Sequence, residues 1–389
     1  MNERTLPAWP QVALILGIWG AIALSVGINI SAIKAGLFAI ALLLGLTLKH
    51  AAFGFTTHFR RFLVAGDGRG LRAQMVMLAV ASALMLPVLA RGSILGHGVI
   101  GAVAPVGVSV MAGAFMFGLA MQIANGCASG TLYSVGSGSM RLLVALPFFM
   151  LGSLLGSAHL PWWLEAPSIG SVSLLAKFGL WPALLGQWAA FGLIFLLLRA
   201  WERRRGFSPP PSEGARGPAS IITGPWGWMA GGVILALLNF ATLALSGHAW
   251  TISFGFALWG AKAAQGLGFD LSSVDFWTWP YPARALAGPW LAEDTSLMNL
   301  GVIIGAALSV ALSGGFACPA RIPFRGALGA AIGGLLMGYG ARIAFGCNVG
   351  AYFSGIATAS LHGWEWLLFG LLGSWVGVRL RPLFGLPNP

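Results

Sequence analysis

Residues 338–354 read GYGARIAFGCNVGAYFS, and residues 118–134 read GLAMQIANGCASGTLYS. The two stretches align without a gap at an offset of 220 residues, and both carry the element Gly-Cys-x-x-Gly at the same position. Because glycine lets a helical backbone unwind, each element is expected to break an apolar helix. Paired glycine-broken segments in two halves of a chain are typical of transporters whose broken helices meet near the bilayer midplane. The spacing leaves open whether the repeat is inverted or parallel.

The composition of the chain requires a membrane around it. Of the 389 residues, 57% are hydrophobic and 8% are charged, whereas about a quarter are charged in an average soluble domain. The apolar runs are long and continuous, which excludes the alternating strands of an outer-membrane barrel. We therefore predict an all-α polytopic integral membrane protein with about nine to eleven spanning helices, some of them broken. The runs lie near residues 11–29, 35–49, 73–90, 99–121, 141–157, 180–199, 224–246, 296–313, 324–344 and 364–378.

The charges predict the topology. Lys and Arg outnumber Asp and Glu by 22 to 10 and are concentrated in residues 49–72, in residues 200–223 and near the C-terminal end. By the positive-inside rule these segments are expected to be cytoplasmic, and the basic balance then needs no nucleic-acid partner. The Trp- and Pro-rich segments 158–178 and 268–295 are expected at the periplasmic interface. The first apolar run is interpreted as a retained helix and not as a cleaved signal peptide.

The same patterns predict the domain organisation. Residues 1–199 form an N-terminal repeat half, residues 200–223 a cytoplasmic linker rich in Pro and Arg, and residues 224–389 a C-terminal repeat half. A weaker echo pairs FGFTTHFRR at 53–61 with FGFALWGAK at 254–262. Both halves are expected to be transmembrane.

Three cysteines are the candidate chemical groups. A single membrane cysteine is most often a small packing residue, but Cys127 and Cys347 occupy matching positions of the repeat, which favours a pore-lining role. Cys318, in SGGFACPARIPFR, has no counterpart, because the same offset falls on Gly98. For Cys318, lining the path and packing at a helix end remain equally open. An odd number of cysteines also excludes a disulfide framework as the organising principle.

The distribution of charge within the apolar runs favours an anion as the permeant. No carboxylate is expected at the bilayer centre, with Glu365 near a helix start, whereas Arg342 lies inside an apolar helix. A cation at that depth faces a cavity or a partner, unless it snorkels to the interface. The spacing of Cys and His predicts no metal site, and no motif predicts ATP hydrolysis, a cofactor or a catalytic residue. The predicted path consists of Cys127, Cys347, Cys318, Gly126, Gly130, Gly346, Gly350, Asn348 and Arg342.

At GCASGTLYSVGSGS and GYGARIAFGCNVGAYFSGIATASLHGW the sequence resembles the YeeE/YedE family of bacterial inner-membrane proteins, which have a sulphur transport domain. The likeness includes FGFTTHFRR and WTISFGFALWGAK. It implies an hourglass of helices with short re-entrant ones, and thiosulfate uptake through a narrow path in which thiols hold the anion by S–H hydrogen bonds. Cys127 and Cys347 match the family's motif cysteines. A further family cysteine near the entrance has no clear match early in this chain, and some members are linked to selenium metabolism.

The sequence therefore predicts a multi-pass transporter in the bacterial inner membrane that takes up a small sulphur-containing oxyanion and is not an enzyme. Thiosulfate is the expected substrate. The alternatives are a membrane thiol or persulfide relay protein, or a selenium-compound transporter, acting with a cytoplasmic sulfurtransferase as partner. A structural scaffold would explain the glycines but not the repeated thiols.

Overall fold

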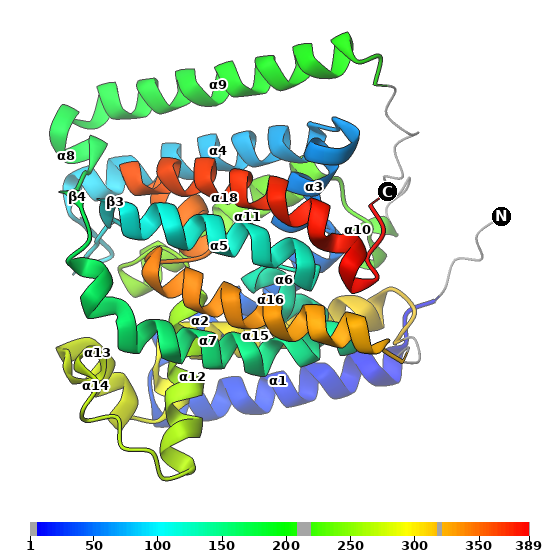
Figure 1. Ribbon diagram of the computed structural model, residues 1–389. Coiled ribbons are helices and arrows are strands. Elements are labelled where there is room, and N and C mark those ends of the chain that lie inside the picture. The colour runs from blue at the N-terminus through cyan, green and yellow to red at the C-terminus, as the bar shows by residue number, and fades with distance from the viewer. Residues whose placement is uncertain (1–5, 208–218, 317–320, 389) are drawn as a thin grey trace.

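The computed structural model describes residues 6–207, 219–316 and 321–388. Within these residues, nine helical segments are long and apolar enough to cross a membrane, or ten if one bent pair is counted as a further span. This confirms the predicted all-α membrane architecture. In Figure 1 most of the long helices lie roughly along one common axis, with α1 (Trp9–Asn29) along one edge and α9 (Leu180–Arg204) along the opposite edge.

The remaining elements follow in chain order. The first half continues with α2 (Ala32–His50), α3 (Phe55–Ala65), α4 (Arg69–Arg91), β1 (Ser93–Ile94), β2 (His97–Gly98), β3 (Pro105–Gly107), α5 (Val108–Ala124), α6 (Ala128–Gly136), α7 (Met140–Leu164), β4 (Ser168–Ser171) and α8 (Leu174–Phe178). After α9 come α10 (Ser220–Thr223), α11 (Trp228–Ser246), α12 (Ser253–Gly266), α13 (Asp275–Thr278), α14 (Pro280–Ala287), the 3-10 helix η1 (Trp290–Ala292), α15 (Asp294–Leu312), α16 (Phe324–Ile343), the π-helix η2 (Asn348–Ser354), α17 (Gly355–Ala357), α18 (Leu361–Leu380) and the 3-10 helix η3 (Arg381–Phe384).

Two predicted boundaries differ from the structure. The apolar run near 99–121 begins as a loop and strand β3, and helix α5 starts only at Val108. Pro105 has no N–H to continue a helix, and β3 pairs antiparallel with β4. The predicted connection from residue 158 begins later, because α7 continues through Pro161 to Leu164. There, Trp163 donates from Nε1 to the hydroxyl of Tyr339 on α16 at 3.0 Å.

The repeat is inverted. Helices α5 and α16 carry the two aligned motifs, and they pack against each other in opposite directions. A Cβ on Gly113, early in α5, would lie 2.6 Å from the carbonyl oxygen of Gly340, late in α16. A Cβ on Gly333, halfway along α16, would lie 2.7 Å from the Cβ of Ala124, the last residue of α5. Equivalent helices therefore cross the molecule in opposite directions, as in inverted-repeat transporters.

Glycines set the closest helix contacts. A Cβ on Gly118 of α5 would lie 2.0 Å from the carbonyl oxygen of Gly370 on α18, and one on Gly152 of α7 would lie 2.0 Å from that of Leu335 on α16. The helix pair α5 and α18 is equivalent in the repeat to the helix pair α16 and α7. One face of α16 consists of small residues and packs on α7, with Gly326, Ala330, Gly334 and Gly338 next to Arg141, Leu142, Ala145 and Phe149. Small residues let membrane helices approach this closely.

The basic segments gather at one end of the bundle, as predicted. Arg72, at the start of α4, forms an ion pair of 2.9 Å with Glu202 near the end of α9, and the N–H of Trp226 donates to the carbonyl of His50. Figure 1 places β3, β4, α8, α13 and α14 at the other end. The positive-inside rule makes the first end cytoplasmic, and we call it the inner end; its assignment stays a prediction. Residues 208–218 of the predicted linker lie outside the described residues, and the domain boundaries also stay a prediction.

Candidate functional site

The first helix break lies between α5 and α6. Asn125 closes α5 in the left-handed region, with φ 68°, and Cys127 is the N-cap residue of α6. The backbone N–H of Gly130 donates to the Cys127 Sγ at 3.4 Å, and the Ser129 hydroxyl lies 3.4 Å from the same sulphur. The thiol thus takes the place of the side-chain oxygen that usually caps a helix. Gly126 packs against Leu142, which a Cβ would meet at 2.7 Å.

The second break lies between α16 and η2, where the helix axis bends by 42°. Phe345 has φ 56° and Gly346 has φ 157°. Phe345 aligns with Asn125 in the repeat, so both breaks use a left-handed residue two positions before the cysteine. A large aromatic residue rarely adopts this conformation, and such strain is concentrated at functional sites. The π-helix that follows Cys347 is likewise rare and often functional.

The structure buries both repeated cysteines in the same apolar core. Both thiols are free, both are buried, at 1% and 0% exposure, and both belong to one apolar core. Neither side chain faces lipid, and the two are not sealed apart in separate packing. In this conformation the thiols lie behind the protein surface, so a path along them would be closed.

A cavity of about 280 Å³ reaches the second break from the end of the molecule that carries β3. The loop before β3, the residues before and at the start of α12, and the break itself form its walls. Its lining includes the predicted residues Arg342, Gly346 and Gly350, which flank Cys347 in sequence. The other lining residues are Ala102, Val103, Ala104, Pro105, Thr251, Ser253, Phe254, Phe345 and His362. We call this space the outer cavity.

Arg342 gives the outer cavity its charge. Its Nε and Nη1 atoms are buried and have no hydrogen-bond partner among the described residues. Its guanidinium lies over the rings of Phe276, at 4.9 Å, and Phe254, at 5.9 Å. Aromatic faces hold a cation in position but do not satisfy its N–H donors. Arg342 therefore keeps free donors at the wall of the cavity, which agrees with a cavity-facing arginine and not with snorkelling.

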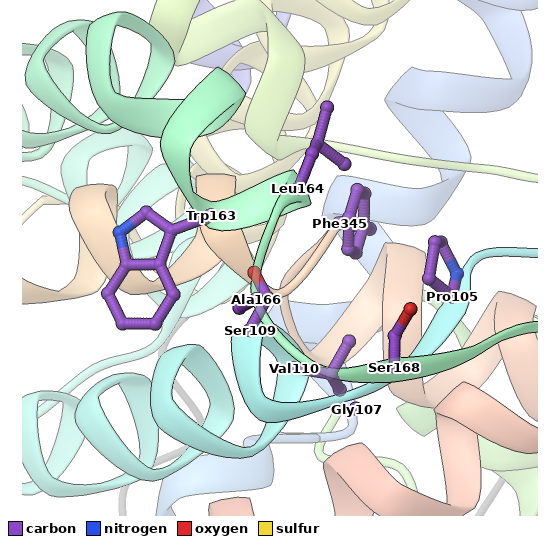
Figure 2. Close-up of a pocket in the computed structure, with 9 residues that line it drawn as sticks. All are labelled: Pro105, Gly107, Ser109, Val110, Trp163, Leu164, Ala166, Ser168 and Phe345. Carbon is purple, nitrogen blue, oxygen red and sulfur yellow. The ribbon is translucent and has the colours of Figure 1, made fainter.

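Phe345 separates the outer cavity from a smaller pocket. This pocket has a volume of about 30 Å³, roughly the space of one water. Figure 2 shows Phe345 beside it together with Pro105, Ser168 and Leu164. Pro105 and Phe345 line both spaces. The side chain of the strained residue thus forms a wall next to the second break.

The other predicted residues lie as follows. Gly130 sits against the Cys127 sulphur, and Asn348 is buried, with Nδ2 donating to the Met121 sulphur at 3.8 Å and Oδ1 without a partner among the described residues. This contact joins the second break to α5. Cys318 lies outside the described residues, and its role stays a prediction.

Several residues that line the outer cavity were not predicted from the sequence. Thr251 and Ser253 line the outer cavity from the stretch WTISFGF, where polar residues interrupt an apolar run, and that interruption was an available signal. His362 also lines the cavity, and its Nδ1 lies 2.6 Å from the Ser360 hydroxyl. Phe345 gave no sequence signal, because a phenylalanine in an apolar helix is ordinary.

Comparison with known proteins agrees with this arrangement. A family described as Sulphur transport matches residues 50–376. The "Thiosulfate transporter TsuA" of Spirochaeta thermophila is 29% identical over 280 residues, covering 68% of this chain and 74% of that protein. The protein of the same name in Escherichia coli is 25% identical over 365 residues, covering 87% and 93%.

A third relative covers less of the chain. The "Probable transporter YedE" of Escherichia coli is 32% identical over 168 residues, covering 42% of this chain and 40% of that protein. The resemblance drawn from the two motifs is thereby confirmed. Since the family match covers most of the chain and contains both broken helices, the chain belongs to the sulphur transport family of membrane proteins.

Proposed function

We propose that this protein carries thiosulfate into the cell across the inner membrane of a bacterium. The observation that carries the proposal is the unpaired Arg342 guanidinium in a cavity walled by the Cys347 break. Two relatives named as thiosulfate transporters support the choice of anion. Thiosulfate is a small dianion, and a guanidinium with free N–H groups is a strong partner for such an oxyanion.

The proposed path runs from the outer cavity past Cys347 to Cys127. A neutral thiol is a weak hydrogen-bond donor, so it can hold the anion briefly and release it, as conduction requires. Because both thiols are buried in the described conformation, passage needs the break segments to move. The strained backbone at Phe345 and Gly346 and the 42° bend are where such a movement would occur.

The proposal is tested by uptake of ³⁵S-thiosulfate into proteoliposomes. Cys127→Ala and Cys347→Ala remove the donors from the path, and Arg342→Gln removes the cation. Each is expected to lower uptake about tenfold or more, since hydrogen bonds to charged groups contribute on the order of 1.5–3 kcal/mol. Arg342→Lys, which keeps the charge, should retain part of the rate. Unchanged uptake in both cysteine variants, at equal amounts of folded protein, would contradict the cysteine path.

Serine variants separate transport from a thiol relay. In a relay, a cysteine thiolate would attack the outer sulphur of thiosulfate, break its S–S bond and release sulfite. The resulting persulfide would pass its outer sulphur to a cytoplasmic sulfurtransferase, which we propose as a candidate partner. The hydroxyl of Cys127→Ser or Cys347→Ser still donates a hydrogen bond but cannot carry a persulfide. In the same uptake assay, the serine variants should exceed the alanine variants if the path is a transport path. Equal and complete loss in both kinds of variant would favour the relay.

A further inference from the structure

Three arginines converge at the inner end, beside the first break. The Oδ1 of Asn125 accepts hydrogen bonds from Nη1 of Arg60, at 2.9 Å, and from Nη1 of Arg381, at 3.1 Å. Arg141, at the start of α7, reaches the same region along α16: its Nη2 lies against Gly326, and Gly329, one turn further, packs against Phe384 of η3. The three come from α3, α7 and η3, and Asn125 stands two residues before Cys127. The group therefore lies at the end of the path opposite the outer cavity.

Unlike the neighbouring arginines, these three have no carboxylate partner within the residues that the structure describes. Among the described residues, the nearby Arg69 pairs with Asp67 at 2.8 Å and Arg72 pairs with Glu202 at 2.9 Å. No ion pair within the described part of the chain involves Arg60, Arg141 or Arg381. Like charges held together without a counter-ion are costly, and the cost is greater away from water.

Each of the three also keeps a buried N–H group without an acceptor. These are Nε of Arg60, Nη1 of Arg141 and Nε of Arg381, judged against the described residues. Arg381 is only 3% exposed, so water does not explain its orphan donor. Arg141 is held against the start of α16, where a Cβ on Gly326 would lie 2.5 Å from its Nη2. Fixed, convergent and unsatisfied donors are the features of an oxyanion site.

We propose that Arg60, Arg141 and Arg381 form a second anion site, which receives a small divalent oxyanion after it has passed Cys127. The identification of that anion as thiosulfate rests on the proposed function, whereas the site itself rests on three arginines that have no carboxylate partner and that each keep a buried N–H without an acceptor among the described residues. This second site and Arg342 would place positive charge on both sides of the two buried thiols.

The test is equilibrium binding of ³⁵S-thiosulfate to the purified full-length protein in an Arg342→Gln background, where the outer cation is absent. Adding Arg60→Gln and Arg141→Gln should raise the dissociation constant about tenfold or more, because two charge-assisted contacts are lost. The matched control is Arg61→Gln with Arg325→Gln, which removes two charges from more exposed positions at the same end. That control should change binding less than about twofold, since exposed charges are screened.

Each outcome decides the proposal. Restored binding in Arg60→Lys with Arg141→Lys supports it, because the charges remain. Equal losses in the control pair and the test pair would mean a diffuse surface attraction and overturn it, as would unchanged binding in the test pair. Loss of binding with phosphatidylglycerol present, and its return when that lipid is removed, would assign the site to a lipid headgroup and also overturn it. A protein that binds thiosulfate at this site but carries none into liposomes would refute the proposed function alone.

Discussion

At the scale of single residues, the two breaks are equivalent in position but not in strain. Asn125 and Phe345 both occupy the left-handed region. Asparagine adopts this conformation several-fold more readily than most residues, whereas for a bulky residue it is an outlier. The second break is therefore the more strained of the two, and its cysteine lies beside the outer cavity. If the proposed path opens, movement should begin there.

Gly346 and Gly350 provide a matched pair for this idea. A Cβ on Gly346 would lie 2.6 Å from the backbone nitrogen of Ala351, and the backbone there has φ 157°. A Cβ on Gly350 would meet only the Cβ of Thr251, at an ordinary 3.6 Å. Gly346→Ala should destabilise the protein by about 1–3 kcal/mol, and Gly350→Ala by much less. Thermal unfolding in detergent measures both, and equal stabilities would show that the break tolerates a side chain.

At the scale of elements, glycines hold several pairs of helices at backbone contact within the described residues. Among them are α7 with α16, α5 with α18, and α2 with α15. In the last pair, a Cβ on Gly305 would lie 1.9 Å from the carbonyl oxygen of Leu42, and one on Gly45 would lie 2.1 Å from that of Val302. Membrane helices gain little from apolar burial against one another, so close backbone packing decides their association.

Gly305→Ala tests the contribution of this packing. The added methyl group would have to push α2 and α15 apart, at a cost of about 2 kcal/mol or more. Gly192→Ala is the control, because Gly192 lies in the spanning helix α9 and a Cβ added there would meet nothing within 4 Å. The first variant should unfold at a clearly lower temperature than the parent, and the second at the same temperature. A neutral Gly305→Ala would mean that the two helices can separate freely.

At the scale of the whole molecule, a polar cluster joins the outer ends of α2 and α15 to the segment between α11 and α12. Asp294, at the start of α15, forms an ion pair with Lys34 of α2. It also lies 3.4 Å from Nε2 of His248, in the segment between α11 and α12. Burial by itself would lower the pKa of His248, but the hydrogen bonds to Asp294 and to the Ala249 carbonyl, with the charges of Asp294 and Glu293, raise it above its usual value.

This cluster predicts how stability depends on pH. A histidine whose pKa is higher in the folded state stabilises the fold while it is protonated. Its contribution is complete below the ordinary pKa of 6.5 and is lost as the pH rises through the higher folded-state pKa. The melting temperature should therefore fall between about pH 6 and pH 9, and His248→Gln should flatten the curve. A parent protein whose melting temperature rises over this range would contradict the assignment.

Most of the fold and part of the candidate site could be predicted from the sequence. Long apolar runs located the spanning helices, and the repeated motif located both breaks and both thiols, because glycine and helical periodicity act locally. The inner arginines could not be found in this way. Arg381 is separated from Asn125 by 256 residues and Arg60 by 65, so only the folded chain reveals that they share an acceptor. Phe345 was equally hidden, since its strain depends on backbone conformation and not on residue type.

The opposite directions of α5 and α16 bear on the direction of transport. Both ends of the proposed path are made from equivalent backbone elements in opposite orientation, so the backbone alone favours neither end. Any rectification has to come from the side chains that differ. Outside, one arginine stands on the broken helix itself, and inside, three arginines reach in from other elements. Exchanging those few charges would change how readily each side takes up the anion while leaving every helix in place.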